Sequence, residues 1–457
     1  MRRVQYLRRE LDASDLARFE LYAGRIVHLA DNMKPGPPVT WLDQTFLRAL
    51  SLYYGPSTPF TQLFTLECRD RILHSEGPPG LDGWTILCSP RLHNLTINTD
   101  VDIGNDALPS LLTFVTRCPS MQQLILHFPV SSVEGAATLT GVVRAIKTLN
   151  KFVCGFLSTP LPIELLAALA ALPHLNHLDV QLIPGYDFQL GQRLRVVTSE
   201  VPRDRSVFDE TTHFGLEVDR PQTYHTVLAG MAFKKLERAI ILLSTRGHYH
   251  NIGPCFTALR DSCAPNFSGL VELYYEDCIN TLRIRDPYIS IAARHPITLD
   301  TLAPLLSFHS LEGVFIKTMN PVQLTDQDVD TLAAAWPRLR YLQLDCAVEA
   351  ELLSAYECVT LAGLASLARR CPRLEYLDLF VGASERHLPD DIEVPAEGKG
   401  GCLKRLTVQD SLCDQPEKVA AFLRNLFPSL RIINTNGPHT GPDANPWKRV
   451  AELLVDL

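Results

Sequence analysis

A recurring phrase of apolar residues organises the chain. Cys371–Leu379 (CPRLEYLDL), Trp336–Leu344 (WPRLRYLQL) and Cys118–Leu126 (CPSMQQLIL) share the pattern Pro-x-Leu-x-x-Leu-x-Leu, with conservative exchanges. The last two apolar residues are two positions apart, so in an extended chain both side chains point to one face. The residues that alternate with them point to the other face. Each copy of the phrase therefore predicts one short β-strand with a buried face and an accessible face.

Ten further segments align with this phrase, which gives thirteen copies in all. We call the first apolar residue of each Leu-x-x-Leu-x-Leu the anchor; the anchors are Ile26, Leu63, Leu92, Met121, Leu149, Leu175, Leu236, Leu270, Leu311, Leu339, Leu374, Leu403 and Leu430. Neighbouring anchors lie 26 to 41 residues apart, except for one interval of 61 residues after Leu175. That interval spans about two units, and Thr212–Val218 (THFGLEV) is a degenerate strand inside it. A period in this range is typical of solenoids and propellers.

Upstream of several strands the apolar spacing becomes helical. Segments 107–117, 163–171, 329–335 and 361–370 carry apolar residues three to four positions apart. The proline at the start of a following phrase ends the helix, because proline disfavours helical conformation in the residue before it. One strand and one helix per unit of about 30 residues is typical of leucine-rich repeats, whereas a propeller blade has four strands.

We therefore predict an α/β fold, a right-handed leucine-rich-repeat solenoid of horseshoe form with parallel strands on the concave side and helices on the convex side. The alternative is a doubly wound α/β protein, which also alternates apolar strands with helices. That fold does not need the same phrase at every strand. A solenoid does, because each unit stacks on a copy of itself.

The expected organisation has three parts. Residues 1–24 form an N-terminal helical cap, residues 25–434 hold about 13–14 irregular repeats, and residues 435–457 form a C-terminal capping segment with a helix. Two polar stretches interrupt the repeats, near 184–221 and near 384–401, and their proline, glycine and charge content predicts loop insertions.

Cysteines recur at equivalent positions of the repeats. Cys88, Cys118 and Cys371 stand just before a predicted strand, and Cys278 and Cys346 just after one. Recurrence in register indicates packing, because a small polarizable residue fits under stacked turns. We expect all twelve cysteines to be free thiols.

The phrase Cys-Pro-x-Leu-x-x-Leu-x-Leu at Cys118 and Cys371, with a serine inserted after Cys88, resembles the cysteine-containing repeats of fungal F-box/leucine-rich-repeat proteins. Ser14–Leu29 is similar to the start of the repeats in that family, and Trp447–Leu457 to its closing helix. The resemblance implies a non-catalytic protein-recognition module, the substrate-binding part of an SCF-type ubiquitin ligase receptor.

The F-box itself is not visible in this chain, either before Asp15 or later. In the family this helical module docks on the Skp adaptor of a cullin-RING ligase. Skp and cullin are therefore expected partners only if an F-box lies upstream. The alternative is a free-standing leucine-rich-repeat scaffold or sequestering protein without ligase attachment.

Composition narrows the classes of partner and compartment. The chain has 43 Lys and Arg against 51 Asp and Glu, a net charge of -8, so a nucleic-acid partner is not expected. No apolar run approaches the roughly 18 residues that a membrane-spanning helix requires. Met1–Glu10 is charged throughout and does not read as a signal peptide. We expect a cytoplasmic or nuclear protein.

The motifs of catalysis and metal binding are weak. His248 and His250 with Cys255 and Cys263 match no regular zinc spacing, so no metal is expected there. The chain has no Gly-x-Ser-x-Gly and no His-Glu-x-x-His, and its carboxylates are scattered over the repeats. We expect no catalytic residue, no cofactor and no enzyme activity.

The accessible strand positions give the candidate binding face. On the predicted concave side, aromatic and acidic residues gather at Glu272, Tyr274, Glu276, Phe315, Tyr341, Asp345, Tyr376, Asp378 and Phe380. Exposed aromatics fit the composition of binding hot spots, although tyrosine and phenylalanine are also simply good strand residues. We expect this face to bind a protein segment with basic and apolar side chains.

Overall fold

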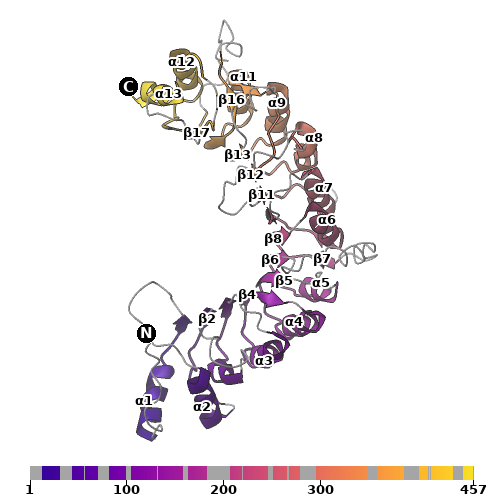
Figure 1. The fold of residues 1–457 in the computed structure, drawn as a ribbon, viewed down its shortest axis with the longest axis vertical. Helices are drawn as coiled ribbons and strands as arrows, with labels where there is room; N and C mark the ends of the chain where they lie inside the picture. The colour runs from indigo at the N-terminus through magenta and orange to yellow at the C-terminus, as the bar shows by residue number, and fades with distance from the viewer. Residues whose placement is uncertain are drawn as a thin grey trace, which may run out of the picture. The chain divides into compact units, whose positions relative to one another are not determined.

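A computed structural model gives the fold of the chain (Figure 1). It describes residues 13–30, 44–55, 57–69, 82–98, 104–130, 132–157, 163–182, 206–218, 220–244, 251–264, 267–277, 295–346, 358–384, 401–409, 411, 413–435 and 446–455. The chain forms two compact units, each described by itself below. The first comprises Met1–Leu216 with Gly230–Phe233, and the second comprises Glu217–Ala229 with Lys234–Leu457.

The first unit is a run of parallel strands with helices between them. The strands, hydrogen-bonded in chain order, are β1 (His28–Ala30), β2 (Thr65–Arg69), β3 (Asn94–Asn98), β4 (Gln123–Val130), β5 (Lys151–Leu157), β6 (His177–Leu182) and the greater part of β8 (His213–Val218). The helices are α1 (Ala13–Ala23), α2 (Gln44–Tyr54), the 3-10 helix η1 (Asp82–Leu87), α3 (Gly104–Thr116), α4 (Val133–Ala145) and α5 (Ile163–Ala170). Two short strands, β7 (Ser206–Phe208) and β9 (Met231–Phe233), pair separately.

The second unit repeats this arrangement. Its parallel strands, again in chain order, are β10 (Arg238–Leu243), β11 (Glu272–Asp277), β12 (Gly313–Thr318), β13 (Tyr341–Cys346), β15 (Tyr376–Asp378), β17 (Arg405–Thr407) and β18 (Ile432–Asn434). Its helices are α6 (Pro221–Ala229), α7 (Gly253–Ser262), α8 (Leu299–Leu302), η5 (Ala303–Ser307), α9 (Asp326–Ala335), α11 (Leu361–Arg370), α12 (Pro416–Leu426) and α13 (Pro446–Val455). A small pair, β14 (Val359–Thr360) and β16 (Val381–Gly382), adjoins them.

The repeated phrase sets where each strand begins. Every one of the thirteen strands that follow a predicted anchor starts two residues after it, as Leu339 precedes β13 and Leu374 precedes β15. Twelve of the thirteen anchors are buried; Ile26 is half-buried. The mixed α/β class with parallel strands is thus confirmed for the described residues.

The degenerate copy inside the long interval also forms a strand, β8. It begins two residues after Thr211, which takes the anchor position and is 1% exposed. The Thr211 hydroxyl donates to the carbonyl oxygen of Leu175, the preceding anchor, at 2.9 Å. This hydrogen bond lets a polar residue occupy a buried apolar position. The predicted insertion near 184–221 therefore contains β7, β8 and the start of α6, while residues 183–205 lie outside the described part.

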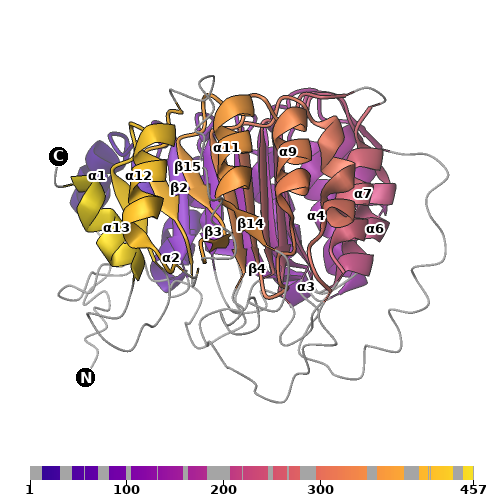
Figure 2. The same ribbon diagram turned by 90° about the horizontal axis from the view of Figure 1, so that it is seen from above.

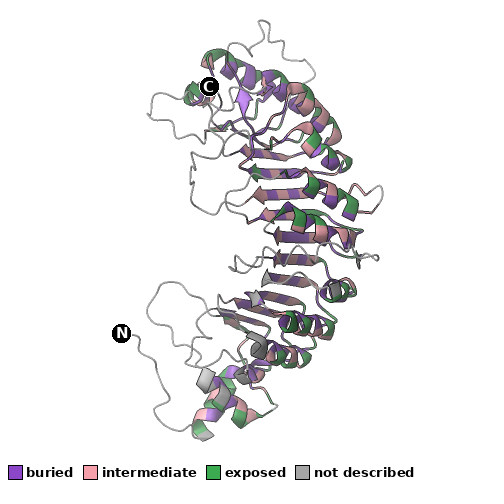
Figure 3. Ribbon diagram, turned by 45° about the vertical axis from the view of Figure 1, so that its right-hand side comes forward, coloured by how far each residue is buried: buried purple, intermediate pink, exposed green. Residues whose placement is uncertain are grey.

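The core of each unit lies between the strands and the helices. Figure 3 shows buried and half-buried colours alternating along the strands. In β13 the buried positions include Leu342 and Leu344, and half-buried residues alternate with them. In the second unit α9, α11 and α12 stand side by side against one face of the strands (Figure 2). We call the other face, which carries the half-buried residues, the open face. Among the described residues, none of the helices combines the length and apolar character needed to cross a membrane.

The turns before the strands stack through a regular hydrogen-bond ladder. The carbonyl oxygen of the residue after one anchor accepts two N–H groups from the next repeat; Glu312, for example, accepts from Arg340 at 2.8 Å and Tyr341 at 2.9 Å. We call the residues directly before and after the anchors the pre-anchor and post-anchor residues. Because strands lie about 4.8 Å apart, the side chains at each of these positions form a column.

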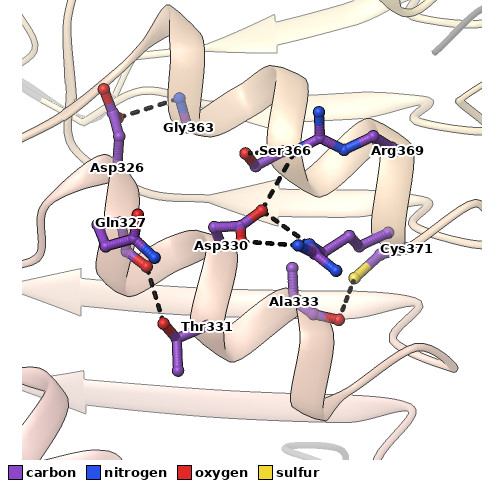
Figure 4. Close-up of polar contacts among 10 residues, drawn as sticks. Asp326, Gln327, Asp330, Thr331, Ala333, Gly363, Ser366, Arg369 and Cys371 are labelled. Carbon is purple, nitrogen blue, oxygen red and sulfur yellow. Dashed lines mark hydrogen bonds and ion pairs between the residues drawn. The ribbon is translucent and has the colours of Figure 1, made fainter. Parts of the chain in front are cut away.

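The recurrent cysteines lie in the same turns. The Cys371 thiol donates to the carbonyl oxygens of Trp336 at 3.4 Å and Ala333 at 3.7 Å, where α9 ends, and Figure 4 shows the second contact. Cys88 makes a similar contact with the carbonyl oxygen of Phe114, at 3.8 Å. Helix ends leave carbonyl groups without intrahelical partners, and the thiol is a weak donor that reaches them. Cys278 lies outside the described residues.

Neighbouring helices of the second unit are joined by aspartates of α9 (Figure 4). Asp326 accepts hydrogen bonds from the Thr360 N–H at 2.7 Å, the Thr360 hydroxyl at 2.6 Å and the Gly363 N–H at 3.0 Å, so it caps the start of α11. One turn later Asp330 pairs with Arg370 at 2.7 Å and with Arg369 at 3.3 Å. These contacts fix the spacing between α9 and α11 on the helical side of the unit.

Candidate functional site

Seven of the nine predicted binding residues lie half-buried on the open face of the second unit: Glu272, Tyr274, Glu276, Phe315, Tyr341, Asp345 and Tyr376. Strand register brings them together, since Tyr274 is paired with Phe315, and Tyr341 with Tyr376. Their side chains are thus partly accessible and share one surface, as the alternation in the sequence predicted.

Three of these aromatic side chains form a continuous row. The rings of Tyr274 and Phe315 have centroids 6.3 Å apart, and those of Phe315 and Tyr341 are stacked with centroids 6.2 Å apart. We call Tyr274, Phe315 and Tyr341 the aromatic row. Gly313 makes the second contact possible, because a Cβ atom there would lie 2.9 Å from Cε2 of Phe315. The phenyl ring therefore occupies space over the Gly313 backbone, and Gly313 is the residue in register with Tyr341.

Two acids of the face form ion pairs with cations on neighbouring strands. Glu272 is ion-paired with Arg238, and Glu276 with Lys317 at 3.0 Å. The Tyr274 hydroxyl donates to the second carboxylate oxygen of Glu276. These contacts keep the end of the aromatic row in place. They also mean that a basic group of a partner has to share these carboxylates with Arg238 and Lys317.

The structure contradicts the predicted accessibility of two residues, since Asp378 is 1% exposed and Phe380 is 6% exposed. β15 ends at Asp378, so the alternation stops there. Gln409, whose φ of 49° places it in the left-handed region, donates from Nε2 to the Asp378 carboxylate and to the Leu344 carbonyl oxygen, both at 2.9 Å. Burial raises the pKa of Asp378 to about 6. Neither side chain is accessible, so neither contributes to the surface of the open face.

Tyr376 lies at the edge of this buried cluster. Its hydroxyl donates to the Asp378 carboxylate at 3.3 Å, and burial raises the pKa of the phenol. It stands in register between Tyr341 and Arg405. Tyr376 therefore extends the accessible aromatic surface toward β17, while its hydroxyl is held by the buried Asp378 carboxylate.

A group of charged residues beside the row was missed by the strand alternation. Post-anchor residues Glu312, Arg340, Glu375 and Lys404 alternate in sign, and Arg340 Nη2 and Lys404 Nζ each lie 2.7 Å from the Glu375 carboxylate. Arg340 also reaches Glu312 at 3.9 Å. Lys404 and Arg340 hold the pKa of Glu375 below its usual value. The alternating charges at one repeat position are the sequence signal that could have found this column.

Arg340 links the charged column to the aromatic row. Its guanidinium carbon lies 5.3 Å from the centroid of the Tyr341 ring, a cation–π distance. The same side chain lines a pocket of about 440 Å³ together with Glu312, Arg373, Glu375, Cys402, Lys404 and Ser429. A polar pocket at the edge where the strands begin thus adjoins the apolar row of the open face.

Within the described residues, no group of three or more His, Cys, Asp and Glu side chains is arranged to hold a metal ion. His248 and His250 lie outside the described part, and burial raises the pKa of Cys255 and of Cys263 to about 12. These two thiols are therefore protonated at neutral pH and are poor nucleophiles or metal ligands.

One strongly perturbed carboxyl group has a structural explanation. Burial raises the pKa of Asp277, at the end of β11, to about 7. Its oxygens accept hydrogen bonds from the Thr318 hydroxyl at 2.6 Å and the Met319 N–H at 2.9 Å, so it closes the end of the neighbouring strand β12.

The chain matches no protein-family model and no curated protein, and the role of the open face is therefore inferred from its own residues.

Proposed function

We propose that the chain is a non-catalytic protein-recognition module and that the open face of its second unit binds a segment of a partner protein. The observation that carries this proposal is the aromatic row of Tyr274, Phe315 and Tyr341, half-buried on a strand face. Aromatic side chains lose little conformational entropy on binding and dominate the energetics of many interfaces. A contiguous row of partly exposed aromatic side chains is typical of a surface that binds another molecule.

The proposed architecture is a right-handed leucine-rich-repeat horseshoe whose concave side is the open face. Two observations support it: strands start at a fixed distance from their anchors, and helices recur between strands. Cysteines that reach the ends of neighbouring helices also fit the cysteine-containing repeat type. Concave strand surfaces of such solenoids present several repeats at once to an extended ligand.

The partner segment is proposed to be apolar with flanking basic side chains. Apolar groups would cover the three rings, and basic groups would approach the carboxylates of Glu272, Glu276 and Asp345. Since Glu272 and Glu276 are already paired with Arg238 and Lys317, the apolar contact supplies most of the affinity. The charges mainly set orientation and the rate of association.

The resemblance to F-box/leucine-rich-repeat proteins extends this proposal to ubiquitin ligation. In that case the bound protein is a substrate, and ubiquitin transfer belongs to subunits attached through an F-box upstream. The alternative is a free-standing scaffold or sequestering protein. Recovery of a Skp adaptor together with the partner would favour the first, and recovery of the partner alone would favour the second.

Affinity purification with mass spectrometry tests the proposal. The test variant changes Tyr274, Phe315 and Tyr341 to alanine, and circular dichroism checks that it remains folded. We expect it to lose the partners that the unmodified chain recovers, because removing one central aromatic alone costs roughly 2 kcal/mol or more of binding free energy.

A matched control carries three alanines on the helical side of the same unit, at Gln327, Lys418 and Asn425, all of which are exposed. The control should recover the same partners as the unmodified chain. An unchanged partner set in the aromatic variant, or the same loss in the control, would contradict recognition by the open face.

A further inference from the structure

A pocket of about 440 Å³ lies beside the aromatic row, among the turns that precede the strands. Two successive pre-anchor residues are the long side chains of Arg338 and Arg373, and the next two are Cys402 and Ser429. Post-anchor residues continue along the other side of the same turns. The pre-anchor side chains thus become shorter from Arg373 to Cys402 and Ser429, and all three of these residues line the pocket.

The charges around the pocket do not cancel. Glu312, Arg340, Glu375 and Lys404 contribute two negative and two positive charges, and they are joined in one chain of ion pairs. Arg373 is the remaining charged residue of the lining. The pocket therefore carries a net charge of about +1, in a chain whose net charge is -8.

The Arg373 guanidinium is available for a ligand. It is exposed, and none of the described residues pairs with it through a hydrogen bond or an ion pair. Guanidinium presents N–H donors in a planar fork that matches a carboxylate, which it binds through two parallel hydrogen bonds. The Ser429 hydroxyl supplies a further donor in the same wall.

We propose that this pocket binds the carboxylate of one acidic side chain of the partner segment. This inference rests on the proposed function and adds the chemistry of a second contact. Arg340 connects the two sites, since it lies over the Tyr341 ring and also lines the pocket. The segment thus presents an apolar stretch to the aromatic row and a carboxylate to Arg373.

Cys402 allows the pocket to be probed without knowing the partner. This free cysteine is exposed and lies in the pocket wall, so small thiols can be captured there by thiol–disulfide exchange. The probes are 3-mercaptopropionate, 2-mercaptoethanol and cysteamine, which place a carboxylate, a hydroxyl or an ammonium group at similar reach. Each is equilibrated with the folded chain as a mixture of thiol and disulfide, and peptide mapping measures the fraction bound at Cys402.

We expect the carboxylate probe to be favoured over cysteamine by about fivefold, as one accessible charge pair would give, and the preference to fall as salt is added. Arg373→Gln should remove the preference and Arg373→Lys should retain most of it. Arg338→Gln is the matched control, since Arg338 is the pre-anchor residue one repeat earlier and does not line the pocket. Comparing ratios between variants cancels the intrinsic exchange constants of the probes.

Equal capture of the carboxylate and ammonium probes would overturn the proposal, as would a preference that survives Arg373→Gln or a Cys402 thiol that captures none of the three. The measurement involves no partner protein. It can therefore fail while the aromatic row still recovers partners, and it can succeed if recognition by the row fails.

Discussion

Replacing Asp326 with alanine tests how neighbouring repeats of the second unit are held together. Its carboxylate accepts three hydrogen bonds from the start of α11, two from backbone N–H groups and one from the Thr360 hydroxyl. Asp326 also lies in the first turn of α9. A negative charge is favourable at both helix N-termini, because the unpaired N–H groups there carry partial positive charge.

The expected cost follows from these contacts. Losing a helix cap costs typically about 1 kcal/mol, and hydrogen bonds to a charged group are worth more than neutral ones. Because Asp326 is half-buried, water replaces part of what is lost. We expect Asp326→Ala to destabilise α11 by about 2–3 kcal/mol. Asp326→Asn, which keeps one acceptor oxygen but not the charge, should cost about 1 kcal/mol.

Native-state hydrogen exchange is the appropriate assay, because it measures local opening at individual amides. The amides of Thr360 and Gly363 should exchange about 30- to 150-fold faster in Asp326→Ala. Gln327→Ala is the matched control, an exposed neighbour in the same turn of α9. If Asp326→Ala and Gln327→Ala leave these amides equally protected, the carboxylate does not clamp the two helices and the reasoning is refuted.

Three further predictions concern the core, the pH dependence and the thiols. Leu342→Ala and Leu377→Ala each remove a buried side chain and should cost about 2–5 kcal/mol, seen as a lower denaturation midpoint; unchanged midpoints would mean that the register is wrong. The raised pKa of Asp277 favours its protonated form in the folded state, so its contribution to stability is complete below about pH 4 and is lost as pH rises through about 7. The melting temperature of Asp277→Asn, measured relative to that of the unmodified chain, should therefore rise between about pH 5 and pH 8. A difference that stays constant over this range would contradict the raised pKa of Asp277. Under native conditions an alkylating reagent should label exposed Cys402 first and buried Cys154 last, a ranking that peptide mapping checks.

The regular part of the fold was accessible from the sequence because one phrase recurs. The anchors predicted where strands begin, and the helical spacing predicted α5 and α11 nearly to the residue. For α9 the apolar pattern begins at Val329, but the helix begins at Asp326, because its first turn is polar and capped by Thr325. Polar caps carry no apolar periodicity, so helix starts were the weaker part of the prediction.

The open face was only partly predictable. Alternation identified the aromatic row correctly, but it assumed that every strand continues to the third accessible position. β15 stops after three residues, and Gln409 from another repeat covers Asp378. Contacts between residues 31 positions apart leave no mark on local periodicity. The charged column lies in the turns, where strand alternation does not apply.

Photo-crosslinking from the aromatic row tests the central claim most directly. Benzoylphenylalanine is placed at Phe315, where it replaces one aromatic ring with another, and separately at Gln327 on the helical side of the same unit. The bound partner is irradiated with each form, and the crosslinked product is identified by mass spectrometry. Recognition by the open face predicts a crosslink to the partner from position 315 and none from position 327. A crosslink from position 327 alone would contradict it.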